Sequence, residues 1–338
     1  MILSFEEWPG TLGTVTRTPD RLARSLRRTT SIHSTWPDGF DGDFALTARG
    51  RDLLTTADGA GVVIGDARVD VRAEGPLKTV RSFTSVPAVP NLPLLEGANL
   101  TSGFRKAAAT NLALGDGSVL ALLFDDLPAA ALVSGSARLR AMIEETGELP
   151  GFANVDLPVV CIGRRHDGVM DQRRSEGRPL IGQGPPAGNL DRPDDPLAWP
   201  WEPPLPTHGM RRLRRIDITV VDDAIIVDTH FRDSYQESSG VESSVHEYEV
   251  LVSAGAVDRK VRTVEVRPRV LPGPDCPAAA ASARAIVGQP LEQLRAFVRA
   301  EMRDDTICTH LNDQLRSLAD VPALVEALEG SSLGPQPL

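Results

Sequence analysis

Alternation of apolar and polar residues in the second half of the chain constrains the fold more than any other feature. The stretch IDITVVDDAIIVDTHF alternates on both sides of an Asp-Asp pair, which predicts two antiparallel strands joined by a tight turn. HEYEVLVSAG and KVRTVEVRPRV have the same period of two and predict two further strands. This half therefore predicts an antiparallel sheet.

The period becomes helical after the fourth predicted strand. AAAASARAIVG, LEQLRAFVRAEM and THLNDQLRSLADV each fit a helix, and Gly288 is suited to end the first of them. A run of strands followed by a run of helices is typical of an α+β fold. We expect an antiparallel sheet that the C-terminal helices cover on one face.

The first half resembles a diverged copy of the same plan. Leu26-Arg27-Arg28 recurs as Leu213-Arg214-Arg215 at an offset of 187 positions. Two tandem copies are one interpretation, and chance similarity between short segments is the other. The predicted organisation is an N-terminal extension (1–24), an N-terminal α+β lobe (25–140), a connecting segment (141–208) and a C-terminal α+β lobe (209–330).

Residues 184–207 form the most proline-rich part of the chain, with eight prolines. Each proline lacks a backbone donor and restricts the residue before it to extended conformations. The segment is therefore either a semi-rigid spacer or a strap that Trp199 and Trp201 pin to a surface.

Composition excludes several classes of protein. With 338 residues and a 41% apolar fraction the chain can bury a core without disulfides, and its net charge of −10 argues against a general nucleic-acid binder. Acidic residues stand where a signal peptide needs basic ones, and no run approaches the ~20 apolar residues of a membrane span. We expect a cytoplasmic protein, and the three cysteines predict reduced thiols or metal ligands.

Three side chains form a candidate metal site. Cys276 follows Asp275 at a predicted helix start, where the helix dipole favours a thiolate, although a small apolar packing role is the alternative. Cys308 begins the inward face of the last helix, and His246 lies on an apolar strand face. His246, Cys276 and Cys308 would bind one zinc or iron ion and leave a fourth position open.

Other polar residues near these elements are candidates for catalysis. Arg232 could bind a carboxylate, and His230 or Asp233 could act as a base, although a solvated strand face is the alternative. Tyr248 shares the strand face of His246, and His310 could share a site with Cys308 only if the helix begins after that cysteine. Cys161 in LPVVCIG is interpreted as a buried strand residue.

The order of these motifs resembles two families. CPAAAASARAIVGQPLEQL followed by CTHLNDQLRSL is similar to the second and third cysteine motifs of the iron-sulfur cluster scaffold family, over residues 244–326. His246-Glu247-Tyr248 stands where that family has Cys-Gly-Asp, so the resemblance implies a scaffold-like fold with one cysteine replaced. CTHLND, HEYEV and VDTHFRDS resemble an uncharacterised bacterial family (domain of unknown function 2889) over most of the chain, which implies no activity.

Three hypotheses about function follow. The first is a metal-dependent catabolic enzyme, a lyase or hydrolase, acting on a small aromatic or carboxylated molecule. The second is a non-enzymatic metal or iron-sulfur carrier, and a binding scaffold without a metal is the third reading. We expect the protein to bind a small molecule and neither nucleic acid nor a membrane. A homodimer is compatible with the sequence.

Overall fold

The computed structural model describes residues 8–75, 77–147, 159–176 and 183–332, and it contains one continuous antiparallel sheet. The eight strands lie in the order β4-β3-β2-β1-β5-β6-β7-β8. Both predicted hairpin strands and the two that follow them are confirmed. The strands are β1 (Ser25–Thr35), β2 (Asp43–Thr55), β3 (Gly61–Glu74), β4 (Val80–Val86), β5 (Met210–Val221), β6 (Ala224–Gln236), β7 (Glu242–Gly255) and β8 (Val261–Val270).

The two halves of the chain meet at the centre of the sheet. β1 pairs with β5 over its length, from Ser25 opposite Thr219 to Ser34 opposite Met210. Each half adds its other three strands outward as a simple meander. The predicted lobes therefore share one sheet.

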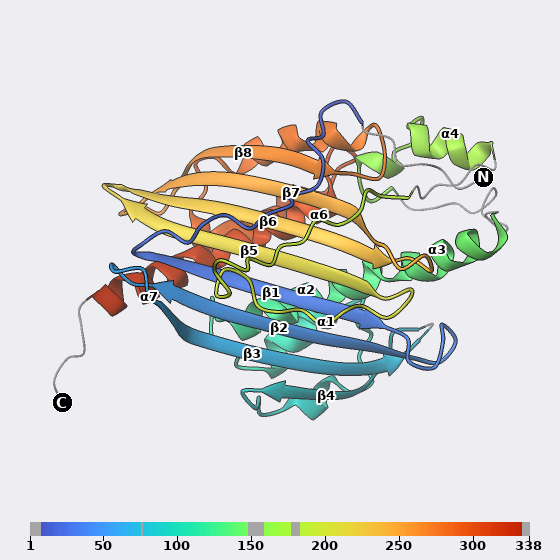
Figure 1. Cartoon of the computed structure of the whole chain (residues 1–338), viewed down its shortest axis with the longest axis horizontal. Helices are drawn as coiled ribbons and strands as arrows, with labels where there is room; N and C mark the ends of the chain where they lie inside the picture. Colours follow the sequence, from blue (N-terminus) through green and yellow to red (C-terminus); the bar gives the residue numbers. More distant parts are fainter. Residues whose placement is uncertain (1–7, 76, 148–158, 177–182, 333–338) are drawn as a thin grey trace.

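Helical segments follow the strands in both halves. They are η1 (Leu92–Leu95), α1 (Phe104–Asn111), α2 (Val119–Val133), α3 (Gly135–Thr146), η2 (Ile162–Arg164), α4 (Val169–Ser175), η3 (Cys276–Ile286), η4 (Leu291–Gln293), α5 (Leu294–Glu301), α6 (Thr309–Ser317), η5 (Leu318–Asp320) and α7 (Val321–Ser332). Figure 1 shows α1, α2, α6 and α7 behind the sheet, on one face. The expected α+β class with helices on one face is confirmed.

Apolar residues in phase with the strands fill the space between the sheet and the helices. On β6, Ile225 and Val227 are fully buried, and each such burial contributes about 1.5–3 kcal/mol. One cluster joins β5–β8 to the C-terminal helices, and a second joins β2 and β3 to α1 and α2. The stretch Val119–Thr146 has the length and hydropathy of a membrane span, but 67% of its apolar window is buried inside the molecule, as in a core helix.

Paired arginines lie between the two clusters on the helix face. Arg28 of β1 donates to Asp52 and to Asp320, and Arg214 of β5 donates to Asp126. Both guanidinium groups are almost completely buried. Since these arginines occupy the same face as neighbouring core residues, the seam between the clusters is ionic.

The offset of 187 does not relate equivalent faces of the two central strands. Leu26 packs in the core on the helix side, whereas Leu213 packs on the opposite face with Trp199. In both strands the even-numbered residues face the helices, so an odd offset reverses every side chain. This alignment of the two halves is wrong.

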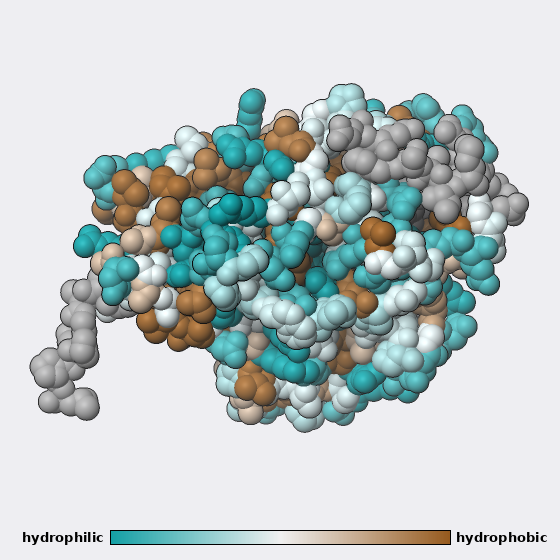
Figure 2. Space-filling model, in the orientation of Figure 1, coloured by the Kyte–Doolittle hydropathy of each residue, from teal (hydrophilic) through white to brown (hydrophobic). Residues whose placement is uncertain are grey.

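The open face of the sheet is covered by chain from two regions. Figure 1 shows the N-terminal segment before β1 and residues 183–209 crossing the strands in front, and Figure 2 shows the resulting surface as mostly hydrophilic. We call residues 184–207 the strap. Trp199 of the strap is 4% exposed and packs with Val15, Leu190 and Leu213, which favours the pinned strap over the spacer, whereas Trp201 is 70% exposed and anchors nothing.

Two local predictions are corrected. The alanine-rich segment after Asp275 is the 3-10 helix η3, and Asp275 makes no side-chain cap, because its carboxylate accepts from the backbone N–H of Val169. Cys161 is half-buried at the start of η2 and belongs to no strand.

Candidate metal centre

Three polar side chains meet on the helix face of the sheet, where β6, β7 and the first turn of α6 come together. Asp233 and His246 are direct partners in the β6–β7 register, and period two turns both toward the helices. His310 follows the first residue of α6 and approaches them from the helix layer. One donor atom from each residue lies within 4.8 Å of the other two.

The two imidazole rings are in face-to-face contact. Their centroids are 3.5 Å apart and their planes differ by 13°. Nε2 of His310 lies 3.5 Å from Oδ2 of Asp233. Nδ1 of His246 and Nε2 of His310 are buried, and neither has a hydrogen-bond partner among the described residues.

Asp233 is held in place by an arginine. Arg212 donates through Nε to Oδ1 at 2.9 Å and through Nη2 to Oδ2 at 2.8 Å, and its Nη1 reaches Asp313 at 3.1 Å. This two-point contact fixes the plane of the carboxylate. Each carboxylate oxygen still has a lone pair for a further ligand.

Burial keeps both histidines neutral. Desolvation, reinforced by the charge of Arg212, lowers the pKa of His310 to about 3. Desolvation and the neighbouring His310 lower the pKa of His246 well below its ordinary value. A neutral imidazole is the form that binds a metal ion.

Tyr248 of β7 lies in the adjoining core together with Cys276 and Cys308, which come from the helix layer. The Tyr248 hydroxyl is buried without a nitrogen or oxygen partner among the described residues. Burial, and then the adjacent Cys308, raise the pKa of Tyr248 well above its ordinary value. Burial also raises the pKa of Cys276, and that of Cys308 to about 11, so the thiolate expected at the helix start is not favoured.

The predicted ligand set is only partly brought together. His246 is at the centre, and α6 does begin after Cys308, whose Sγ lies 3.9 Å from Nδ1 of His310. Cys276 instead packs against Gly163 in the apolar core. The residues that converge within one ion's reach are Asp233, His246 and His310, two of which the sequence had indicated as catalytic.

His230 and Arg232 do not join this centre. Both lie on the strap face, where Nε2 of His230 is 2.7 Å and Nη2 of Arg232 is 2.8 Å from Oε1 of Glu247. Arg232 also donates to the backbone oxygens of Val15 and Gly188. His230 and Arg232 therefore lie across the sheet from Asp233, because alternate residues of β6 point to opposite sides of the sheet.

Sequence reasoning missed Arg212 and the acidic partner Glu247. The sequence feature that could have identified them is a charged residue at a position where strand alternation predicts burial. Arg212, for example, lies on the same strand face as Ile216 and Ile218, which are both buried. Such a residue is buried only when it is paired.

Comparison with known sequences identifies one segment. Residues 210–324 match the sequence model of the family described as Protein of unknown function (DUF2889). The match runs from β5 into α7 and includes Asp233, His246 and His310. The expected resemblance to an uncharacterised family is thus confirmed for this segment.

No curated protein and no solved structure matches the chain. The resemblance to the iron-sulfur cluster scaffold family therefore receives no support.

Proposed function

We propose that Asp233, His246 and His310 bind one divalent transition-metal ion, zinc or iron, and that the protein is a metal-dependent enzyme. The observation that carries the proposal is the pair of buried, unpartnered imidazole nitrogens beside a carboxylate. A buried polar atom without a partner is costly, and an ion would satisfy all three groups at once.

The donor set suits both metals. Donor atoms around a tetrahedral zinc ion lie about 3.3 Å apart, close to the 3.5 Å between His310 and Asp233. Two histidines and one carboxylate also form the set typical of non-haem iron. Because the ion must lie in the plane of each imidazole, one of the two parallel rings has to turn about its Cβ–Cγ bond on binding.

The remaining residues of the site support acid–base chemistry. A bound ion would supply Lewis acidity and lower the pKa of a coordinated water. Tyr248 stays protonated and can donate a hydrogen bond to a bound group, and Arg212 holds Asp233 in position. We propose a hydrolase or lyase that acts on a small aromatic or carboxylated molecule.

Elemental analysis tests the ligand set directly. Protein purified without chelators should contain about one zinc or iron per chain. His310→Gln should lose the metal, whereas Cys276→Ser and the opposite-face control His230→Gln should keep it. If Cys276→Ser lost the metal and His310→Gln retained it, His246, Cys276 and Cys308 would be the ligands instead. Wild-type protein without bound metal would overturn the proposal.

A non-enzymatic metal or iron-sulfur carrier is the second candidate. It is favoured by the proximity of Cys161, Cys276 and Cys308, each close enough to influence the titration of a neighbour. It requires visible absorption after anaerobic reconstitution, lost in Cys308→Ser. A cobalt-substituted protein without a sulfur-to-cobalt charge-transfer band would count against it.

We also propose that the two halves arose by tandem duplication. Each half has four meandering strands followed by a 3-10 segment and helices, arranged symmetrically about β1 and β5. If the two halves are aligned with an even offset, so that Arg28 matches Arg214, equivalent side chains lie on the same face of the sheet. Superposition of β1–β4 on β5–β8 should give this offset.

A further inference from the structure

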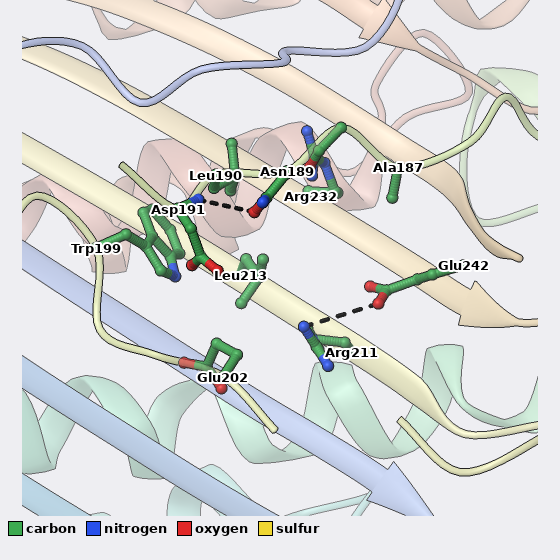
Figure 3. A pocket seen from close by; sticks show the side chains of 11 residues that line it. Ala187, Asn189, Leu190, Asp191, Trp199, Glu202, Arg211, Leu213, Arg232 and Glu242 are labelled. Atoms are coloured by element: carbon green, nitrogen blue, oxygen red, sulfur yellow. Dashed lines mark hydrogen bonds and ion pairs between the residues drawn. The ribbon is translucent and has the colours of Figure 1, made fainter. Parts of the chain in front are cut away.

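A pocket of about 230 Å³ lies between the strap and the open face of the sheet. Its floor comes from β5, β6 and β7, and its roof from two stretches of the strap, residues 187–191 and 199–202. Leu190 and Leu213 supply apolar wall, and the remaining lining is largely polar or charged (Figure 3). The metal centre lies on the other face of the sheet, so nothing in this site depends on it.

Two donors in the pocket have unused capacity. Trp199 is 4% exposed, yet its indole N–H makes no hydrogen bond with any described residue, and Figure 3 shows the nitrogen on the side of the ring toward the pocket. Arg211 donates through Nη2 to the backbone oxygen of Pro203 and forms an ion pair with Glu242, 3.7 Å from its Nη1, which leaves Nη1 without a hydrogen bond. The Trp199 ring is buried but its nitrogen stays accessible, so the N–H can donate to a ligand in the pocket.

Acceptors stand beside these donors. The carboxylate of Asp191, an exposed residue of the strap, makes no hydrogen bond or ion pair with a described residue, and Figure 3 shows it beside Leu213. Glu202 is held by His33, with Nε2 of the histidine 2.9 Å from Oε2. Arg232 contributes no free charge, because Glu247 and two backbone oxygens occupy its guanidinium group.

We propose that this pocket binds a small zwitterion, an α-amino acid. Its carboxylate would accept from the Trp199 indole and from Nη1 of Arg211, and its ammonium group would donate to Asp191 and Glu202. A simple amine would leave the two donors unsatisfied, and a simple anion would have no cationic group to offer the carboxylates of Asp191, Glu202 and Glu242. The volume equals that of about eight water molecules, which limits the ligand to a compact side chain.

Binding is tested by isothermal titration of the full-length protein with the twenty L-amino acids. At least one should bind, and its decarboxylated amine and its N-acetyl derivative should each bind at least tenfold more weakly. Equal binding of the amine or of the N-acetyl derivative would overturn the zwitterion assignment, and no binding of any probe would overturn the site.

Variants locate the site. Trp199→Phe keeps a ring in the strap but removes the N–H, and Glu202→Gln removes one counter-charge; each should weaken binding at least fivefold. Arg267→Gln, on an exposed part of β8, is the matched control and should bind as the wild type does. Circular dichroism identifies a variant that fails to fold, and unchanged affinity in both folded variants would contradict the proposal.

Discussion

Buried arginines are the most unusual residues of this protein. Among the largest fully buried side chains are five arginines, and all of them lie on the central strands: Arg27, Arg28, Arg214, Arg215 and Arg232. A buried charge is tolerated only with a partner, and removal of one partner costs more than the pair contributes. Each arginine therefore makes the protein sensitive to the loss of an aspartate or glutamate.

Asp126→Asn tests this sensitivity. Asp126 receives three hydrogen bonds from Arg214, and it is the one acidic side chain in direct ion-pair contact with that arginine among the described residues. The substitution should lower the free energy of unfolding by about 3–5 kcal/mol in urea titrations. Asp223→Asn, which breaks an exposed pair with Arg262, should change it by less than ~1 kcal/mol. Equal small effects in both variants would contradict the argument.

Lys78 gives the protein a pH dependence of a different origin. Burial lowers the pKa of Lys78 to about 7, and its ammonium group lies over the ring of Phe44. Between pH 7 and about 10 the unfolded chain binds a proton at this residue that the folded chain does not. Stability from this residue therefore rises with pH across that window, and is lower below pH 7, where the buried amine must be charged.

Lys78→Met should remove this contribution. The difference in unfolding free energy between wild type and variant should shift in favour of the wild type by up to ~1 kcal/mol per pH unit between pH 7 and 9. Urea titrations at three pH values measure it. A difference that is constant with pH would show that Lys78 stays charged in the folded protein.

Prediction from sequence succeeded for individual residues where period two was undisturbed. His246 and Tyr248 were placed on one face because strand alternation fixes the direction of each side chain. Which residues meet across the sheet and helix layer depends on packing angles that no local pattern contains. For this reason Cys276 was assigned to the metal site and Asp233 was assigned only a role as a base.

At the scale of elements, the strap and the N-terminal segment depend on one buried carboxylate. Oε1 of Glu247 accepts from His230 and Arg232 of the sheet and, at 3.1 Å, from the backbone N–H of Val15. Arg232 in turn donates to Gly188 of the strap. Since both covering segments are held through this group, they should loosen together.

Glu247→Gln should expose the strap to proteolysis. The neutral amide leaves Arg232 buried without a counter-charge, which should destabilise the fold by about 3 kcal/mol. Chymotrypsin should then cleave after Leu190 of the strap, now 5% exposed, several-fold faster than in wild type, as followed by mass spectrometry. Glu249→Gln, a half-buried site two residues along the same strand face, is the control. Unchanged cleavage at Leu190 would mean that other contacts hold the strap.

Elements were predicted unevenly for a physical reason. The strands of the second half carry their own alternation, so β5–β8 could be read directly. The 3-10 form of η3 and the position of the strap are set by contacts with residues far away in sequence, such as Val169 with Asp275. The odd offset between halves failed because a one-residue shift in a strand exchanges its faces.

At the scale of the whole molecule, each half completes the ionic seam of the other. Arg28 of the first half donates to Asp320 of the second, and Arg214 of the second donates to Asp126 of the first. β1 and β5 would both become sheet edges if the halves parted, and unpaired edges promote aggregation. The halves should therefore behave as one cooperative unit.

A calorimetric scan of the full chain should show one transition, with equal calorimetric and van't Hoff enthalpies. Fragments 1–182 and 183–338, produced separately, should lack cooperative unfolding, because each leaves buried charges of the seam unpaired and one central strand unprotected. Mixing the fragments should restore the sheet. Two resolved transitions in the intact chain, or a stable isolated fragment, would instead make the halves independent domains, and the reciprocal pairs would then be contacts between finished folds.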